Sequence, residues 1–190
     1  MVNVAIFVSG SGTNCENIIN YFKGSEDVNI ALVLSNRADA YALVRAKILN
    51  VPTVVVPRDN FKKHDGLMPV MERYSIDFIV LAGFLLMVPD FLINAYPQRI
   101  VNIHPALLPK YGGKGMYGHY IHEAVKAAGE KETGITIHYV SEKCDGGEVI
   151  FQAKTALSSY DNVEDIAAKI HLLEQRCYPE IIENVIKEQF

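Results

Sequence analysis

Short apolar segments alternate with amphipathic segments through the first 104 residues, and this alternation constrains the fold more than any other feature. Apolar runs of strand length occupy residues 4–8, 30–34, 53–56, 78–82 and 100–104. Helical patterns lie between them at residues 15–22, 40–49, 66–74 and 89–95. Strands that are apolar on both faces, alternating with helices, are typical of a parallel sheet with right-handed crossovers. The sequence therefore predicts a Rossmann-like, doubly wound α/β fold.

The last third of the chain departs from this alternation. A long glycine-rich loop at residues 110–118 precedes a predicted helix at 121–128. Residues 135–140 alternate and predict a half-exposed strand, and a second strand follows at 149–154. Because the link between these two strands is short, they should pair antiparallel at the edge of the mostly parallel sheet. A final helix, kinked at Pro179, is predicted over residues 163–188. We find no linker or repeat, so residues 1–190 are expected to form a single domain.

Charge and cysteine content restrict the class of partner. The formal net charge of −4 argues against general affinity for nucleic acid, which requires a basic face. No apolar stretch has the length of a membrane span. Three cysteines without CxxC spacing favour free thiols in a reducing cytoplasm. Cys15 lies where a helix start can lower a thiol pKa, but no neighbour completes a reactive site. We expect a cytoplasmic monomer or homodimer that binds small molecules and neither nucleic acid nor membrane.

The segment NIHPALLP at residues 102–109 offers the first candidate site. An apolar strand leads into it, and the prolines at 105 and 109 prevent a helix from following. Asn102 and His104 are two apart on the strand, so their side chains share one face. Ligands of open α/β sheets bind outside the carboxyl ends of the strands. This pair could hold a carbonyl oxygen and transfer a proton there, or it could be a capping Asn beside a buried His.

The segment SGSGTN at residues 9–14 offers the second. It lies between the first strand and the first helix, where glycines and free backbone amides suit a phosphate. It lacks the Gly-Lys-Ser/Thr ending of a Walker A loop and is an imperfect dinucleotide fingerprint. A phosphate monoester held by Gly12, Thr13 and Asn14 fits best. Arg37, after the second strand, could suit a 2′-phosphate, so an NADP-dependent enzyme stays an alternative.

Asp145, in the sequence DGG at residues 145–147, offers the third. The glycines permit a tight turn, which is the structural interpretation. If Asp145 lies beside His104, it favours the protonated imidazolium, which can donate a proton near neutral pH. A Ser-His-Asp hydrolase is disfavoured because no Gly-x-Ser-x-Gly elbow is present. A metal site is also disfavoured, because no thiolate or carboxylate set completes His119 and His122. We expect His138 to be a packing residue.

Together these segments resemble the glycinamide ribonucleotide formyltransferases, a folate-dependent family with a Rossmann-like formyltransferase fold. The matching features are SGSGTN at 9–14, LAGF at 81–84, NIHPALLP at 102–109, GITIH at 134–138, DGG at 145–147, and the helix containing Glu174 and Tyr178-Pro179. They occur in family order and span nearly the whole chain. The resemblance implies formyl transfer from 10-formyltetrahydrofolate to the amine of 5-phosphoribosylglycinamide, the third step of de novo purine synthesis.

The resemblance also implies a role for residues at the ribonucleotide end. Gly12, Thr13 and Asn14 would hold the substrate phosphate. Glu174 would contact the glycinamide end, with His171 one turn earlier on the same face of the helix.

Three residues would be catalytic by the same resemblance. Asn102 would hydrogen-bond the formyl oxygen and contact the folate, and His104 would serve as acid and proton shuttle. Asp145 would favour the protonated form of His104 and organise water. The co-substrate would be 10-formyltetrahydrofolate, and the reaction requires no metal.

The pterin pocket of the folate would be lined by a run of four residues, which are Leu85, Leu86, Met87 and Val88. The loop at residues 141–147 would close on it. Family members that carry a longer segment after Phe61 use an arginine there to contact the folate. Lys62 or Lys63 can replace it in this chain, and we assign the contact to Lys63. The glycine-rich loop at 112–118 resembles a variant of the loop that gates the substrate.

Other functions remain open at this stage. Related formyltransferases that act on methionyl-tRNA, or that hydrolyse the formyl folate, carry an additional domain for which this chain has no space. An NADP-dependent reductase would use Arg37. A phosphoribosyl-ligand sensor would bind without chemistry, and Asn102, His104 and Asp145 would then be incidental.

Overall fold

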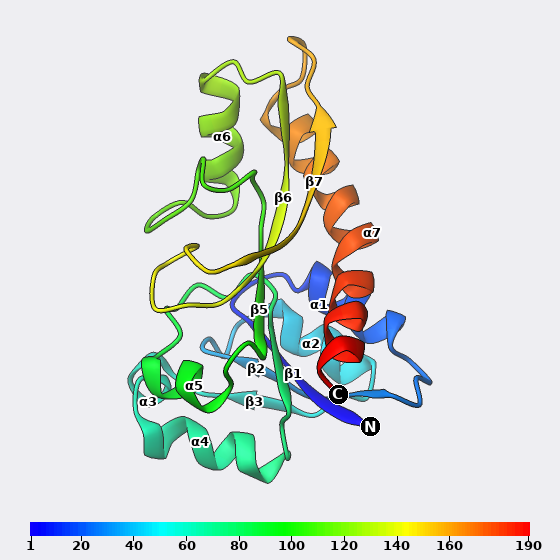
Figure 1. Ribbon diagram of the computed structural model, residues 1–190, viewed down its shortest axis with the longest axis vertical. Helices are drawn as coiled ribbons and strands as arrows, with labels where there is room; N and C mark the ends of the chain where they lie inside the picture. The colour runs from blue at the N-terminus through cyan, green and yellow to red at the C-terminus, as the bar shows by residue number, and fades with distance from the viewer.

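Seven strands form one sheet in the order β3-β2-β1-β4-β5-β6-β7, and helices cover both of its faces (Figure 1). The computed structural model describes residues 1–190. The strands are β1 (Val2–Val8), β2 (Val28–Ser35), β3 (Thr53–Val55), β4 (Phe78–Leu81), β5 (Ile100–His104), β6 (Glu132–Tyr139) and β7 (Val149–Ala156). The helices are α1 (Thr13–Tyr21), α2 (Tyr41–Ile48), α3 (Arg58–Phe61), α4 (His64–Arg73), α5 (Asp90–Ala95), α6 (His119–Ala127) and α7 (Val163–Gln189).

The first five strands are parallel to one another, as the alternation predicts. Strand β6 runs antiparallel to both of its neighbours, β5 and β7, which confirms the predicted antiparallel edge. The strand order reverses on either side of β1, because the chain leaves β1 toward β2 and returns on its other side as β4. Loops diverge at such a switch point and leave a crevice at the carboxyl ends of the strands. The fold therefore opens a ligand site beside the loops that follow β1, β4 and β5.

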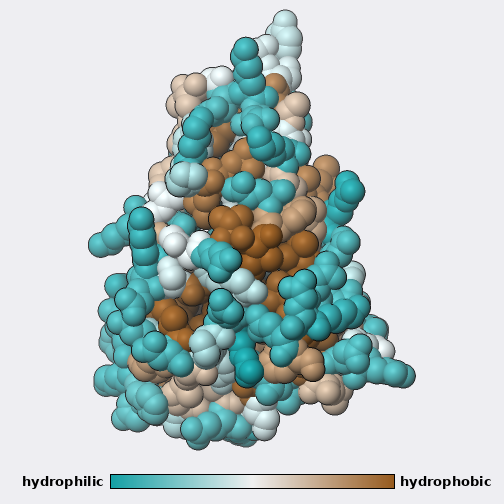
Figure 2. Space-filling view, viewed as in Figure 1, coloured by the Kyte–Doolittle hydropathy of each residue, from teal (hydrophilic) through white to brown (hydrophobic).

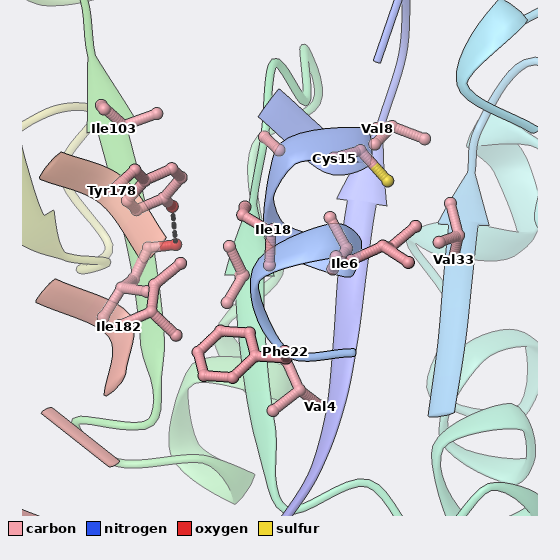
Figure 3. Close-up of a cluster of buried hydrophobic side chains, with 14 of the residues drawn as sticks. Val4, Ile6, Val8, Cys15, Ile18, Phe22, Val33, Ile103, Tyr178 and Ile182 are labelled. Atoms are coloured by element: carbon pink, nitrogen blue, oxygen red, sulfur yellow. Dashed lines mark hydrogen bonds between the residues drawn. The ribbon is translucent and has the colours of Figure 1, made fainter. Parts of the chain in front are cut away.

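Alternate residues of β1 enter two separate hydrophobic cores. Val4, Ile6 and Val8 face the core shared with α1, α2 and α7, where Figure 3 shows Cys15, Ile18 and Phe22 of α1 packed against the strand. Ala5 and Phe7 face the opposite core, which α3, α4 and α5 cover. The period of two residues along a strand produces this division. Burial on both faces explains why β1 is apolar at every position from Val4 to Val8.

Several predicted elements differ in the structure. Strand β6 was expected to be half-exposed, but residues 133–138 are all buried. The reason is that α7 packs on one face, while the segment after β5 covers the other and donates the Leu108 N–H to Thr136 Oγ1 at 3.0 Å. The helix expected at 66–74 begins earlier, because α4 starts at His64, and it is preceded by the short helix α3, whose last residue, Phe61, is fully buried.

The beginnings of α2 and α7 also show what the local sequence dictates. Asp39 precedes α2 but pairs with Arg37 at 2.8 Å, and Ala40 occupies the capping position without a side-chain hydrogen bond. Helix α7 is one element of 27 residues that contains Pro179. It begins with a capping box, in which the Asn162 side chain accepts from the Asp165 N–H and the Asp165 carboxylate accepts from the Asn162 N–H.

None of the helices combines the length and the apolar character that a membrane span requires.

Tyr178 of α7 ties the helix to the centre of the sheet and gives the first prediction. Its fully buried hydroxyl donates to the Leu81 carbonyl at 2.8 Å and lies 3.3 Å from the Val101 carbonyl. Replacing Tyr178 with Phe removes a buried hydrogen bond, so Tyr178→Phe should lower the free energy of unfolding by about 1–2 kcal/mol in urea denaturation. Tyr160→Phe is the matched control, because Tyr160 is 93% exposed, and it should change stability by less than about 0.5 kcal/mol. Equal stabilities for the two variants would contradict the assigned role.

Candidate active site

One large cavity of about 910 Å³ opens at the carboxyl ends of the parallel strands. Figure 2 shows hydrophobic side chains gathered in the middle of the face that it draws, between the α6 region and the α3–α5 region. The cavity is lined by the loops after β1, β4 and β5, by the β6–β7 link, and by one side of α7. Its volume lies in the upper part of the range for small-molecule sites. The three candidate segments of the sequence all meet at this cavity.

The loop at residues 9–14, our candidate anion-binding loop, occupies one end of the cavity at the start of α1. Gly12 has φ = 78°, and a Cβ at this position would overlap Ala42 of α2, so only glycine fits. Gly12 is also the residue before the first turn of α1, whose free backbone N–H groups favour an anion. The amide oxygen of Asn14 is buried and has no hydrogen-bond partner in the protein.

Hydrogen bonds from neighbouring elements fix this loop. Arg45 of α2 donates from Nε to the Ser11 carbonyl at 3.0 Å and pairs with Glu16. The buried Ser9 hydroxyl donates to the Asn36 side chain at 2.6 Å and accepts from the Leu85 N–H at 3.0 Å. The Ser9 N–H donates to the Gly83 carbonyl at 3.1 Å. The loop after β1 and the loop after β4 are therefore joined through one residue.

Asn102 and His138 lie opposite each other in the antiparallel pairing of β5 and β6. Burial lowers the pKa of His138, against the opposing effects of the Tyr139 carbonyl and Asp145, so the ring is neutral. Its Nδ1 lies 2.8 Å from the Tyr139 carbonyl, which can only accept, so Nδ1 holds the proton. Nε2 then accepts from the Asn102 amide nitrogen at 3.1 Å. This bond sets the orientation of Asn102, whose second amide N–H is left for a ligand.

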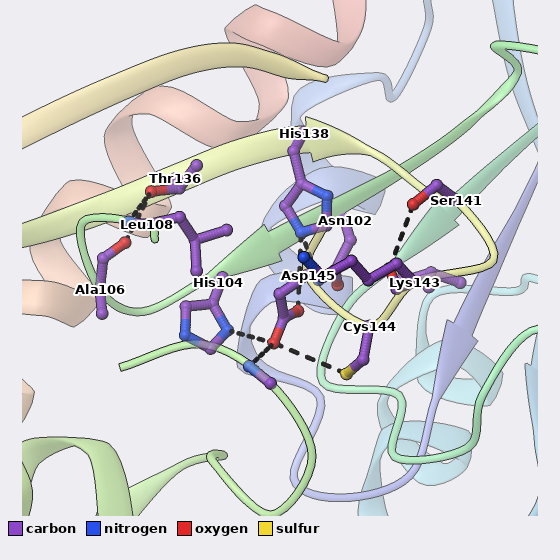
Figure 4. Close-up of polar contacts among 12 residues, drawn as sticks. Asn102, His104, Ala106, Leu108, Thr136, His138, Ser141, Lys143, Cys144 and Asp145 are labelled. Carbon is purple, nitrogen blue, oxygen red and sulfur yellow. Dashed lines mark hydrogen bonds and ion pairs between the residues drawn. The ribbon is translucent and has the colours of Figure 1, made fainter. Parts of the chain in front are cut away.

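His104 and Asp145 meet, as the sequence analysis predicted (Figure 4). The His104 ring is 4% exposed, and its Nδ1 lies 3.6 Å from the Asp145 Oδ2. Its Nε2 lies 2.7 Å from the Tyr111 carbonyl, an acceptor, so Nε2 carries a proton. Nδ1 is therefore the nitrogen that can gain and lose a proton beside the carboxylate. Asp145 also accepts from the Gly113 N–H at 2.9 Å, which joins the loop at residues 110–118 to the His104–Asp145 pair.

Glu174 and His171 extend the site along α7. Glu174 accepts from the Asn14 amide nitrogen at 3.0 Å, and its Oε2 lies 3.7 Å from the His171 Nδ1. Burial raises the pKa of the Glu174 carboxyl, while Asn14 and His171 oppose this increase. Helix α7 thus presents a carboxylate and an imidazole beside the anion-binding loop, where the sequence analysis expected them.

The residues expected at the folate end lie in the cavity, with one exception. Leu85, Leu86, Met87 and Val88 follow β4 and all line it. Lys63 does not line it, whereas Lys62, the other lysine that the sequence left open for the folate contact, does, together with Arg58. Arg58 and Lys62 are four apart, at the start of α3 and just after its end, so they lie on one side of this short helix.

Other candidate residues fall outside the predicted roles. His138 was expected to be a packing residue, but it is both buried and part of the polar cluster; the neighbour relation of β5 and β6 could not be read from the sequence. Arg37 is exposed, pairs with Asp39 and does not line the cavity. The exposed His119 pairs with Glu123 at 3.3 Å, whereas His122 is buried at the cavity wall. No three His, Cys, Asp or Glu residues cluster in a way that could hold a metal ion.

The fold and the cavity define a Rossmann-like α/β protein with an anion-binding loop and an acid–base group at the carboxyl ends of its strands. The chain belongs to the formyl transferase family, whose profile matches residues 2–182.

Individual relatives agree with this assignment. A protein of Haemophilus influenzae named phosphoribosylglycinamide formyltransferase is 37% identical over 96% of this chain and 86% of its own length. A chloroplastic protein of the same name from Arabidopsis thaliana is 36% identical, and the match covers 98% of this chain and 66% of the relative. The crystal structure of the Anaplasma phagocytophilum phosphoribosylglycinamide formyltransferase superposes with a TM-score of 0.90 at 31% identity, covering 99% of this chain and 88% of that one. The Bacillus halodurans structure of the same name gives 0.88 at 34% identity, covering 99% and 97%.

Cys15 gives a prediction because its environment is opposite to that of a reactive thiol. The side chain is fully buried against β1, and burial raises its pKa to about 12 instead of lowering it. At pH 8 only about one molecule in ten thousand would carry the thiolate. Iodoacetamide should therefore label the partly exposed Cys177 in the folded protein and leave Cys15 unmodified, as measured by peptide mass spectrometry. In denaturant both should react, and rapid labelling of Cys15 in the folded protein would show that the thiol is accessible.

Proposed function

We propose that this protein transfers the formyl group of 10-formyltetrahydrofolate to the amine of 5-phosphoribosylglycinamide, in the third step of de novo purine synthesis, and that residues 1–190 act as one catalytic domain. The relatives named for this reaction cover nearly the whole chain. The observation that carries the proposal is that an anion-binding loop, an amide–imidazole–carboxylate group and an apolar wall with cationic residues line one cavity. Each of the three fits a different part of the two substrates.

The ribonucleotide fits the end of the cavity beside α1. Gly12, Thr13 and Asn14 bind the phosphate through backbone N–H groups at the start of the helix. His171 adds a ring N–H donor, and its Nδ1 lies 3.7 Å from the Glu174 Oε2. Glu174 faces the glycinamide end, where its carboxylate accepts from N–H groups. The amine of the substrate then points toward β5.

The formyl folate fits the opposite end. The pterin lies against Leu85, Leu86, Met87 and Val88, where backbone groups of an irregular segment are available for its ring nitrogens. Arg58 and Lys62 provide positive charge on α3 for the carboxylates of the folate tail. This arrangement brings the formyl group between the two ends, beside Asn102 and His104.

Asn102 stabilises the charge that develops during the transfer. As the substrate amine adds to the formyl carbon, negative charge grows on the formyl oxygen. Because His138 holds one amide N–H of Asn102, the other is fixed in direction before the reaction begins. Donors placed in advance in this way are the largest single contribution to many acyl-transfer reactions.

His104 moves the proton. Its Nε2 is held by the Tyr111 carbonyl, so Nδ1 is the nitrogen that exchanges a proton with the reacting groups. The Asp145 Oδ2 lies 3.6 Å from Nδ1 and faces the proton that this nitrogen carries during the transfer. Nδ1 can therefore hydrogen-bond the formyl oxygen as charge develops there, and pass its proton to the departing folate nitrogen as the bond between that nitrogen and the formyl carbon breaks. It then takes up the proton that the attacking amine loses, so the ring returns to its starting state.

The alternative functions receive less support from the same residues. An NADP-dependent reductase would need Arg37 at the ligand, but Arg37 pairs with Asp39 away from the cavity. A ligand sensor would not need an acid–base group, whereas Asn102, His104, His138 and Asp145 form a connected polar cluster at the cavity wall.

The direct test mixes the purified protein with 5-phosphoribosylglycinamide and 10-formyltetrahydrofolate and follows the absorbance of the folate. We expect formation of tetrahydrofolate that depends on both substrates. A folded protein that leaves both substrates unchanged would refute the proposed function.

His104 supplies the test of the mechanism. His104→Ala should lower kcat by roughly 10²–10⁴, the range for lost general acid–base catalysis, measured by the same absorbance assay. His64→Ala is the matched control, because His64 is an exposed histidine that does not line the cavity. The control should keep the wild-type kcat. Wild-type turnover by His104→Ala would assign His104 to the core and not to the chemistry.

A further inference from the structure

His122 of α6 is a buried histidine that the proposed mechanism does not use. Its side chain lines the cavity, and the residue is only 8% exposed. Its neighbours along α6, Ile121 and Val125, belong to the small hydrophobic core between α6 and α7. A polar ring in such a position is expected to have hydrogen-bond partners. His122 has none in the protein.

The burial of one ring nitrogen of His122 indicates which of the two nitrogens carries the proton. Nδ1 is shielded from solvent and has no hydrogen-bond partner. A buried N–H without an acceptor is rarer in proteins than a buried acceptor without a donor. The proton therefore resides on Nε2, which is not among the shielded atoms. The ring offers an N–H donor toward the cavity.

The charge state of His122 limits the kind of ligand atom that it suits. Burial and the neighbouring His119 both lower the pKa of His122, so the ring is neutral. A phosphate beside it would favour the protonated ring, and the anion already has the α1 loop and His171. A neutral N–H in a partly apolar wall is suited to a hydroxyl oxygen.

The position of His122 in the cavity indicates which hydroxyl this is. Ala167, Ile170, His171 and Glu174 form the cavity-facing side of α7, and α6 packs against the beginning of that helix. Glu174 contacts Asn14 of the anion-binding loop. Residues 167 and 174 are about 10 Å apart along the helix axis. A ribose whose 5′-phosphate is held at the loop would lie along this side of α7, in the cavity that His122 also lines.

We propose that His122 is a substrate-binding residue that donates from Nε2 to a ribose hydroxyl of the phosphoribosyl substrate. This inference rests on the proposed function and adds a specificity-determining contact to it. The contact would make the enzyme distinguish a ribonucleotide from its deoxy counterpart.

The test combines a change in the protein with a change in the substrate. The variants are His122→Phe, which keeps a planar ring without a donor, and His122→Gln, which keeps an N–H donor. His119→Gln, on the same helix and exposed, is the control. Each protein is assayed with 5-phosphoribosylglycinamide and with its 2′-deoxy and 3′-deoxy forms, and thermal unfolding confirms that it is folded.

We expect the wild type to lose about three- to tenfold in kcat/KM with one of the two deoxy substrates. His122→Phe should lose a similar factor with the normal substrate, through KM for the ribonucleotide, and should lose nothing more with that deoxy form. KM for the folate should stay unchanged. His122→Gln should retain part or all of the discrimination, and His119→Gln all of it; if the Phe variant fails to fold, His122→Leu, which also lacks a donor, takes its place.

If His122→Phe loses the same factor in kcat/KM as the wild type when either deoxy substrate replaces the normal one, the variant still discriminates and His122 does not touch the ribose. This result would overturn the inference and leave the function intact. Equal discrimination by wild type and His122→Phe, with KM for the normal substrate unaffected, would also overturn it. A wild-type protein without turnover on the normal substrate would refute the function itself, and this result is distinct from the others.

Discussion

The pairing of β5 with a parallel strand on one side and an antiparallel strand on the other decides where the groups of the site lie. Its parallel partner β4 sets Leu81 beside Asn102, so the segment after β4 starts next to the end of β5. Its antiparallel partner β6 sets His138 opposite Asn102 and Thr136 opposite His104. A shift of one residue in either pairing would turn Asn102 and His104 to the other face of the sheet. The Tyr178 hydroxyl, which reaches the Leu81 and Val101 carbonyls, lies at this junction and anchors α7 to it.

The two cores, one on either side of the sheet, hold different parts of the site in place. The core that contains α1 and α7 holds the loop at residues 9–14 and Glu174, because both helices pack on the same face of the sheet, α7 against β5, β6 and β7. The core that contains α3, α4 and α5 holds the segment after β4 through Phe84, Leu86 and Val88. The loop at residues 110–118 belongs to neither. It is fastened to the site by the Tyr111 carbonyl at His104 and by the Gly113 N–H at Asp145.

Local sequence determined the parts of this architecture that depend on local physics. Runs such as residues 4–8 must be strands covered on both faces, and a glycine-rich turn between strand and helix must expose backbone amides. The positions of Asn102 and His104 on one strand face followed from the period of two residues. Strand order depends instead on long-range packing, so the sequence could not place His138 against Asn102. The sequence also did not indicate which elements would bury the two faces of β6. The sequence could not decide between Lys62 and Lys63, of which only Lys62 lines the cavity, because α3 has one turn and too few residues to show a period.

The Ser9 hydroxyl has a consequence for how this site can change over time. It binds Asn36 and the Leu85 N–H at once, and the Ser9 backbone binds Gly83, so one buried side chain fixes the loop after β1 to the loop after β4. A substitution at position 9 alters both loops together. The two parts of the cavity wall that these loops form are therefore a single mutational unit. Selection for a new ligand at one of them has to preserve, or rebuild, the other.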